Sequence, residues 1–125
     1  MVAQSKLLPR IRVVHGTDVA LGPGKVDLLD AIQETGSLSS AAERLSMSYM
    51  RAWTLLKTMN RCFRSPLVKL TRGGKQGGRA ELTDAGRQAL ELYRQMETAG
   101  VTAMQPAWRP SATSFGTLCG AAFRS

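Results

Sequence analysis

The stretch SSAAERLSMSYMRAWTLLKTMNR, residues 39–61, carries two helical patterns separated by a short break. In the first pattern, Ala41 and Ala42 begin a narrow apolar stripe, and small side chains of this kind permit close contact between helices. A serine before the stripe, Ser37 or Ser39, can cap the helix because its side-chain oxygen accepts a hydrogen bond from an unpaired backbone N–H. The first pattern therefore predicts a short helix.

The second pattern begins after the break, where Ser48 is a good cap for a longer helix that runs to about Phe63. Ala52, Leu56 and Met59 mark its apolar side. Two helices joined by about three residues cannot lie parallel, since so short a turn crosses them steeply. The spacing therefore predicts a helix-turn-helix.

The neighbouring segments complete a larger pattern. Pro23 can open an earlier helix at about 24–35, and Gly36 can stop it. Residues 67–70 and 80–82 are short strand candidates on either side of the glycine-rich run TRGGKQGGR, which is typical of a hairpin tip. Its four glycines, Gly73, Gly74, Gly77 and Gly78, can adopt positive φ angles and expose backbone N–H groups.

The two ends of the chain have less regular patterns. Residues 6–14 suggest an edge strand or strand entry, and the following TDVALGPGK suggests a loop. Thr83 can cap a final helix that we expect to stop at Gly100. We predict a mainly α (α+β) winged helix-turn-helix domain with a two-stranded wing and a C-terminal dimerisation helix over residues 1–99. A loosely ordered tail is expected over residues 100–125.

The net charge of +8 is concentrated in one part of the chain. Every charged residue from position 44 to position 79 is basic, whereas a solvated surface normally mixes both signs. A continuous block of one sign creates a field suited to a polyanion, which makes double-stranded DNA the expected partner. The basic residues of the block are Arg44, Arg51, Lys57, Arg61, Arg64, Lys69, Arg72, Lys75 and Arg79.

Other function classes find little support. With 125 residues, of which 43% are hydrophobic, the chain is typical of one soluble globular domain. It has no apolar run of the length of a membrane span or signal peptide, so we expect it in the bacterial cytoplasm, associated with the nucleoid. The single His15 and the isolated Cys62 and Cys119 match neither a zinc site nor a nucleophile–base pair. We therefore expect no metal, no cofactor and no enzymatic activity.

The second helix of the predicted helix-turn-helix, from Ser48 to about Phe63, is expected to enter the DNA major groove as the recognition helix. The role of each candidate DNA contact depends on its position along this helix. Tyr49, Met50, Arg51 and Thr54 are near its start, where side chains reach base edges, and Arg51 can fork onto guanine O6 and N7. Residues farther along the helix and in the wing are expected at phosphates. Trp53 is expected to pack in the core. The full predicted set is Ser48, Tyr49, Met50, Arg51, Thr54, Lys57, Arg61, Arg72, Lys75 and Arg79.

Two motifs resemble the DNA-binding domain of the ModE family of molybdate-responsive transcription regulators. The recognition helix begins with the family's Ser-Tyr-x-x-Ala-Trp pattern, and the wing Gly-Gly-Lys-x-Gly-Gly is followed by Leu-Thr-x-x-Gly. The resemblance covers roughly residues 6–98 and implies a transcription regulator. The matching positions are Ser48, Tyr49, Ala52, Trp53, Gly73, Gly74, Lys75, Gly77, Gly78, Leu82, Thr83 and Gly86.

Two departures from the family pattern are visible. Members that sense molybdate carry C-terminal oxyanion-binding modules rich in strands, and about 27 residues follow the expected end of the last helix here, so we expect no molybdate binding. A separate partner chain could sense the ligand. Met50 stands where the family often has lysine, so the resemblance does not carry over the operator sequence.

The final helix, residues 84–98, is expected to join two copies into a homodimer. Ala85, Ala89, Leu92 and Met96 suit the protein's own core, which would leave Leu90 and Tyr93 for the partner, although these two could instead cover the N-terminal segment. Two other functions stay open for the basic block. It could dock an acidic partner protein, or it could bind DNA without sequence preference as an architectural protein.

Overall fold

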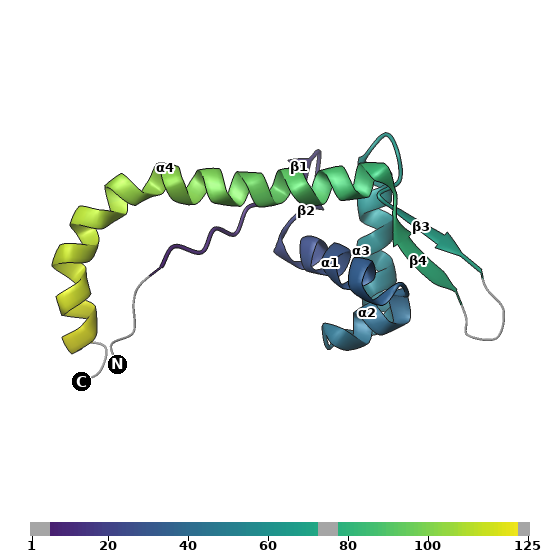
Figure 1. Ribbon diagram of the computed structural model, residues 1–125, viewed down its shortest axis with the longest axis horizontal. Helices are drawn as coiled ribbons and strands as arrows, with labels where there is room; N and C mark the ends of the chain where they lie inside the picture. The colour runs from purple at the N-terminus through teal and green to yellow at the C-terminus, as the bar shows by residue number, and fades with distance from the viewer. Residues whose placement is uncertain (1–5, 73–77, 123–125) are drawn as a thin grey trace. The chain divides into compact units, whose positions relative to one another are not determined.

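The computed structural model describes residues 6–72 and 78–122, with side chains described for residues 6–72 and 78–108 (Figure 1). Its internal contacts divide the chain into one unit, Arg10–Arg94, and a second formed by Met1–Pro9 with Gln95–Ser125. The final helix belongs to both units. The elements, in chain order, are β1 (Val13–His15), β2 (Asp18–Leu21), α1 (Pro23–Thr35), α2 (Leu38–Arg44), α3 (Tyr49–Cys62), β3 (Val68–Thr71), β4 (Arg79–Leu82) and α4 (Asp84–Ala122).

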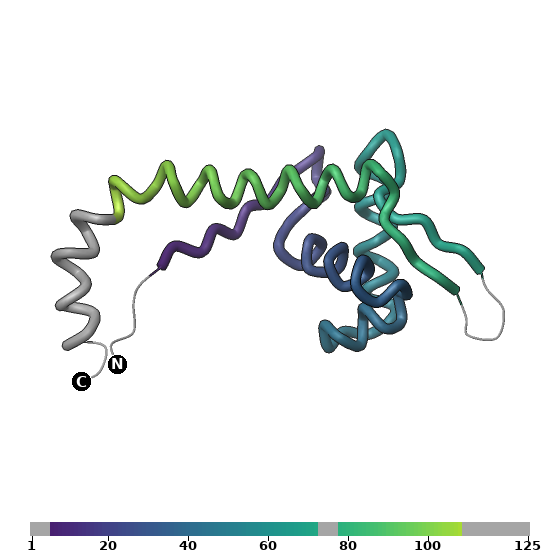
Figure 2. The backbone as a smooth tube through the Cα atoms, viewed as in Figure 1, coloured from purple at the N-terminus to yellow at the C-terminus, as the bar shows by residue number. Residues whose placement is uncertain are grey.

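The Arg10–Arg94 unit confirms the predicted fold class, a mainly helical winged helix-turn-helix. Helices α2 and α3 form the helix-turn-helix, and β3 pairs antiparallel with β4 to form the wing (Figure 2). The wing register places Val68 opposite Leu82 and Thr71 opposite Arg79. The tip of the wing, residues 73–77, lies outside the described residues.

Side-chain and glycine caps set the ends of the first three helices. Gly36 ends α1 in a left-handed conformation with φ 78°, and its carbonyl accepts a 2.9 Å hydrogen bond from the Ala80 N–H of β4. Ser37 caps α2 by accepting from the Ser40 N–H at 3.0 Å, and Ser48 caps α3 by accepting from the Arg51 N–H at 3.1 Å. The predicted helix starts are thereby confirmed, with Ser37 rather than Ser39 as the cap.

The core of this unit collects one face of each helix and the inner side of the wing. Tyr93 of α4 is fully buried, and its hydroxyl donates a 2.7 Å hydrogen bond to the Ile11 carbonyl. This bond joins the beginning of the unit to its end. The largest fully buried side chains are Tyr93, Leu28, Leu29, Ile32, Met59, Leu67 and Val26.

The turn into α4 explains the Leu-Thr-x-x-Gly motif physically. The Thr83 hydroxyl donates to the Pro66 carbonyl at 2.6 Å and accepts from the Gly86 N–H at 3.0 Å, so one side chain caps α4 and holds it to the wing entry. A Cβ at Gly86 would lie 2.0 Å from the Leu67 carbonyl oxygen. The motif therefore fixes a close approach between α4 and the segment before β3.

Two predictions about secondary structure are wrong. The segment expected as a loop after residue 14 contains β2, which pairs with β1 because Gly16, with φ 64°, lets the chain reverse tightly. The last helix does not end at Gly100, since α4 continues to Ala122. The boundary of the DNA-binding domain at residue 99 stays a prediction.

The predicted inner face of α4 is correct at Ala85 and Ala89, which pack in the core, but wrong farther along the helix. Leu90 and Tyr93, assigned to a partner, are buried in the unit's own core. This agrees with the alternative prediction that they cover the protein's own N-terminal segment. Leu92 and Met96, assigned to the core, are 51% and 38% exposed. Gly86 belongs to the buried line of the helix, so the inner face is set by where the helix comes closest to Leu67.

The second unit is described over residues 6–9 and 95–122. A shallow groove of about 380 Å³ lies between Leu8 and Pro9 on one side and residues 97–102 of α4 on the other. In the two ranges that the structure describes, no helix has both the length and the hydropathy that a membrane span requires.

Candidate nucleic-acid interface

Helix α3 separates a buried side from an exposed side along its whole length. Ala52, Leu56 and Met59 point into the core and are at most 3% exposed. The predicted contact residues Tyr49, Met50, Arg51, Thr54, Lys57 and Arg61 are all exposed. The Ser48 hydroxyl is committed to capping the helix. The structure therefore gathers the predicted residues of α3 on one surface.

The centre of that surface follows the helical line Met50, Thr54, Lys57 and Arg61. Lys57 and Arg61 occupy its C-terminal half, and the N-terminal half is uncharged. The Thr54 hydroxyl donates to the Met50 carbonyl at 2.8 Å, one turn back along the same helix. The line is therefore uncharged at its N-terminal end and positively charged at its C-terminal end.

Arg51 lies at one flank of the face, toward α1. Burial lowers the pKa of the Lys25 ammonium of α1, and the nearby charge of Arg51 lowers that pKa further, while Cys62 and Asp18 act in the opposite direction. The charge of Arg51 thus acts on Lys25 of α1. A base contact by Arg51 would come from the side of the helix.

Arg61 is engaged within the protein. Its Nη2 lies 3.2 Å from Asp18 Oδ2 in an exposed ion pair that joins α3 to β2. This pair could not be predicted from the sequence, because its two residues are 43 positions apart in the chain. Exposed pairs are weak, commonly below about 1 kcal/mol, so phosphate can compete for Arg61.

Trp53 lies at the opposite flank and supports a cation. It packs partly buried against the core, in agreement with its predicted role. Its outer ring face carries the Lys57 ammonium, whose nitrogen lies 4.5 Å from the ring centroid. The stacked ring gives Lys57 a preferred position on the surface. This contact could have been predicted from the sequence, because residues four positions apart are neighbours on a helix surface.

A cleft of about 580 Å³ separates α3 from the wing. Tyr49 and Trp53 line it from α3, Arg72 and Arg79 from the wing, and residues 37–39 from the start of α2. Both arginines are exposed. Sequence reasoning identified Tyr49, Arg72 and Arg79 without recognising that they share one cleft, because the distance between α3 and the wing depends on tertiary packing.

Part of the predicted wing lies outside the described residues. Lys75, Gly73, Gly74 and Gly77 fall in that gap, so their predicted roles stay predictions. Gly78 does not have the positive φ that was expected of it. Glycine suits this position because a Cβ would lie 3.0 Å from the Thr71 carbonyl oxygen across the hairpin.

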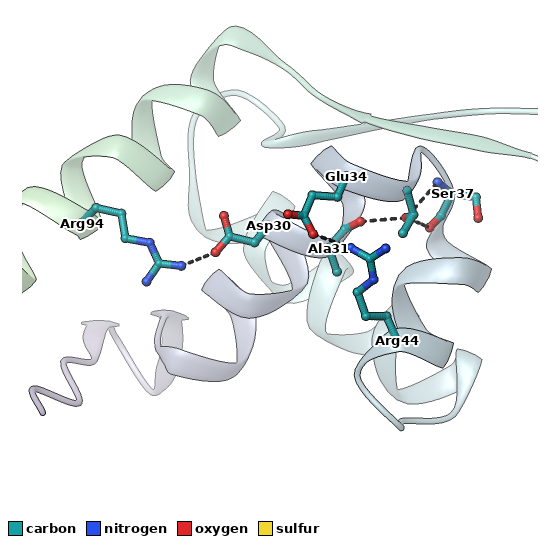
Figure 3. Close-up of polar contacts among 7 residues, drawn as sticks. Asp30, Ala31, Glu34, Ser37, Arg44 and Arg94 are labelled. Atoms are coloured by element: carbon teal, nitrogen blue, oxygen red, sulfur yellow. Dashed lines mark hydrogen bonds and ion pairs between the residues drawn. The ribbon is translucent and has the colours of Figure 1, made fainter.

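The basic block is partly neutralised by acids outside its sequence window. Arg44 of α2 pairs with Glu34 of α1, as Arg61 pairs with Asp18. Outside the block, a similar pair joins Arg94 of α4 to Asp30 of α1 (Figure 3). The Arg44–Glu34 and Arg94–Asp30 pairs link α1 to α2 and to α4. Arg44 is thus engaged with Glu34, while Lys57, Arg72 and Arg79 remain near the α3 surface and the cleft. Within the described part of the chain, no group of three His, Cys, Asp or Glu residues could hold a metal ion.

A helix-turn-helix whose second helix exposes a basic face beside a two-stranded wing defines the class of winged helix-turn-helix DNA-binding domains. Comparison with known families agrees with this class. The chain belongs to the bacterial regulatory helix-turn-helix proteins of the LysR family, whose model matches residues 24–87. This is a family of transcription regulators and not of enzymes.

The predicted resemblance to ModE regulators is confirmed. The chain is 38% identical to the molybdenum transport protein ModE of Azotobacter vinelandii over 93 residues, which are 74% of this chain and 34% of that protein. It is also 38% identical to the molybdenum-pterin-binding protein MopB of Rhodobacter capsulatus over 99 residues, 79% of this chain and 36% of that protein. The chain thus spans about a third of the length of these curated relatives.

Two solved structures share the fold. FabT of Streptococcus pneumoniae in complex with DNA aligns with a TM-score of 0.52 at 15% identity, covering 78% of this chain and 73% of that one. Full-length CbnR complexed with its target DNA aligns with a TM-score of 0.50 at 26% identity, covering 71% of this chain and 28% of that one. Both of these neighbours were solved in complex with DNA.

Proposed function

We propose that this chain is a sequence-specific DNA-binding transcription regulator. Helix α3 enters the major groove as the recognition helix, and the β3–β4 wing follows the phosphate backbone. The observation that carries this proposal is the exposed face of α3, which presents Lys57 and Arg61 while the opposite side of the helix is buried. We extend no molybdenum-related role to this chain, since those names belong to relatives about three times as long as the match.

The exposed residues divide into two groups by their position on α3. Tyr49, Met50, Arg51 and Thr54 occupy the first turn and a half and are proposed to meet base edges. Lys57 and Arg61 come later and are proposed to meet phosphates, as are three residues of the wing. The wing residues are Arg72, Lys75 and Arg79.

The cleft between α3 and the wing is proposed to hold the DNA backbone where it passes between the two elements. Arg72 and Arg79 face Tyr49 and Trp53 across this space. A strand lying there would meet guanidinium groups on one side and aromatic side chains on the other. This arrangement matches a phosphate backbone better than it matches an acidic protein surface, which has no regular spacing of charge.

We also propose that two copies associate through α4, on a surface different from the one expected. Leu92 and Met96 are exposed and stand four residues apart, so they follow one line along the helix. Two recognition helices related by a two-fold axis would double the site and the number of phosphate contacts.

The proposal is tested by selecting preferred duplexes from a random pool and measuring affinity across a salt series. Specific binding requires that the selected duplex bind far more tightly than random DNA, typically by about 10³-fold or more. Replacing Lys57 with alanine should reduce the slope of log affinity against log salt by about one, because one phosphate contact releases about one counterion.

Lys6→Ala is the matched control. It removes the same charge from a residue outside the Arg10–Arg94 unit and should leave the slope unchanged. Equal affinity for selected and random DNA would favour the architectural alternative, and no measurable affinity for either would favour an acidic protein partner.

A further inference from the structure

The exposed face of α3 begins at its N-terminal end with an apolar side chain and becomes cationic toward its C-terminal end. Met50 is 66% exposed, and it begins the central line that Lys57 and Arg61 complete. No acidic residue lies in the first turn of the helix. A large apolar side chain is thus held in solvent at the place where a recognition helix comes nearest to the bases.

Thr54, the next residue on this line, adds a second methyl group. Its hydroxyl already donates to the Met50 carbonyl at 2.8 Å. The hydroxyl hydrogen is therefore used inside the helix, and the methyl group is the part of the side chain left for an apolar contact. The same arrangement recurs at Thr58, whose hydroxyl donates to the Thr54 carbonyl at 3.1 Å.

An apolar tip of this kind can recognise only one chemical group on the major-groove edges of the four bases. Guanine, adenine and cytosine present hydrogen-bond donors and acceptors there, whereas thymine adds a C5-methyl group. Met50 can donate no hydrogen bond to guanine, as a lysine or arginine could. Its long, flexible thioether chain can instead adapt to a methyl surface.

We infer that Met50, with the Thr54 methyl group beside it, contacts the C5-methyl group of a thymine and makes this position a determinant of sequence preference. The inference rests on the proposed function, because it requires α3 to lie in the major groove. It adds the identity of one base and the chemistry that recognises it.

Deoxyuridine provides the direct test, because it pairs as thymine does and lacks only the C5-methyl group. In the selected duplex, each thymine is replaced singly by deoxyuridine and the affinity of the full chain is measured. At one thymine per bound copy, the replacement should weaken binding about fourfold, the effect of exposing one buried methyl-sized group. Replacement at the other thymines should have little effect.

The Met50→Ala variant closes the thermodynamic cycle. It should bind the thymine duplex more weakly than the wild type does, and the sensitive thymine should no longer be distinguishable from deoxyuridine. Met50→Leu keeps an apolar side chain and should retain the distinction. Lys57→Ala is the control, since it should weaken binding to both duplexes by the same factor.

Each other result overturns a defined part of the inference. If no thymine in a specifically bound duplex is sensitive to deoxyuridine, methyl recognition is wrong although the proposed function stands. If Met50→Ala keeps the full sensitivity, another side chain makes the contact. If no duplex is preferred over random DNA, the proposed function itself fails. Unchanged thermal unfolding of the exposed Met50 variants would show that the fold is intact.

Discussion

Gly86 lets α4 pass close to Leu67 because glycine has no Cβ atom. A Cβ there would lie 2.0 Å from the Leu67 carbonyl oxygen, which is backbone and cannot rotate away. Gly24 offers the opposite case, since it is also helical and a Cβ would meet nothing within 4 Å. The two glycines therefore form a matched pair.

We expect Gly86→Ala to lower the free energy of unfolding by about 1–3 kcal/mol, because α4 must move away from the wing entry. Gly24→Ala should raise it by about 0.5–1 kcal/mol, because alanine restricts the unfolded chain and favours the helix. Urea unfolding of both variants measures the difference. A Gly86→Ala protein as stable as the wild type would mean that α4 is not held as tightly as the structure indicates.

Some residue roles could be predicted from the sequence, and others depended on partners far away in the chain. Ser37, Ser48 and Thr83 were identifiable as caps because a cap acts on its own helix within three residues. Arg61 was identifiable as a surface cation, but its pairing with Asp18 was not, because the partner belongs to a hairpin that the sequence did not reveal. The sequence therefore predicts contacts between near neighbours in the chain, but it does not predict pairs that form only when the chain folds.

One amide side chain of the recognition helix is hydrogen-bonded to the start of the wing. Asn60 Oδ1 of α3 accepts hydrogen bonds from the Leu67 and Val68 N–H groups at 2.8 and 3.2 Å, and its Nδ2 donates to the Val68 carbonyl at 3.2 Å. Leu67 and Val68 are buried, so water cannot easily replace these bonds. Asn60 thereby links the two elements proposed to grip DNA.

Replacing Asn60 with leucine should therefore lower the free energy of unfolding by about 1–3 kcal/mol for each buried N–H left without a partner. Amide hydrogen exchange at Lys69–Thr71 of β3 should speed up as the wing loosens. Thr58→Ala serves as the control, because its hydroxyl donates only to the carbonyl one turn back and its loss should change stability by less than about 0.5 kcal/mol. Unchanged exchange in Asn60→Leu would argue against the attachment.

At the level of elements, periodicity predicted the helices better than it predicted which side of them is buried. In α4, the apolar stripe through Leu92 and Met96 was as regular as the true one through Leu90 and Tyr93. The true stripe begins at Gly86, a residue that adds no apolar side chain to a periodic pattern. The pattern could not be resolved without knowing that this glycine touches Leu67.

The whole molecule is proposed to act as a dimer, and the corrected face of α4 gives that proposal a specific test. Replacing both Leu92 and Met96 with glutamate places like charges at the proposed contact, so light scattering should report a folded monomer. Val14→Glu is the control, since Val14 is an exposed apolar residue of β1, 60% accessible, and its replacement should not change the oligomeric state. A wild-type protein that is monomeric at micromolar concentration, or a double variant that stays dimeric, would contradict the proposal.

The hydrogen bond from the Tyr93 hydroxyl to the Ile11 carbonyl has a consequence for how such a unit is reused. It spans 82 positions of the chain and holds together the first and last residues of the Arg10–Arg94 unit. Because the chain enters and leaves at nearly one point, other segments can be joined at either end without threading through the unit. A unit built in this way is portable, which suits a sequence whose curated relatives carry the same region within chains about three times as long.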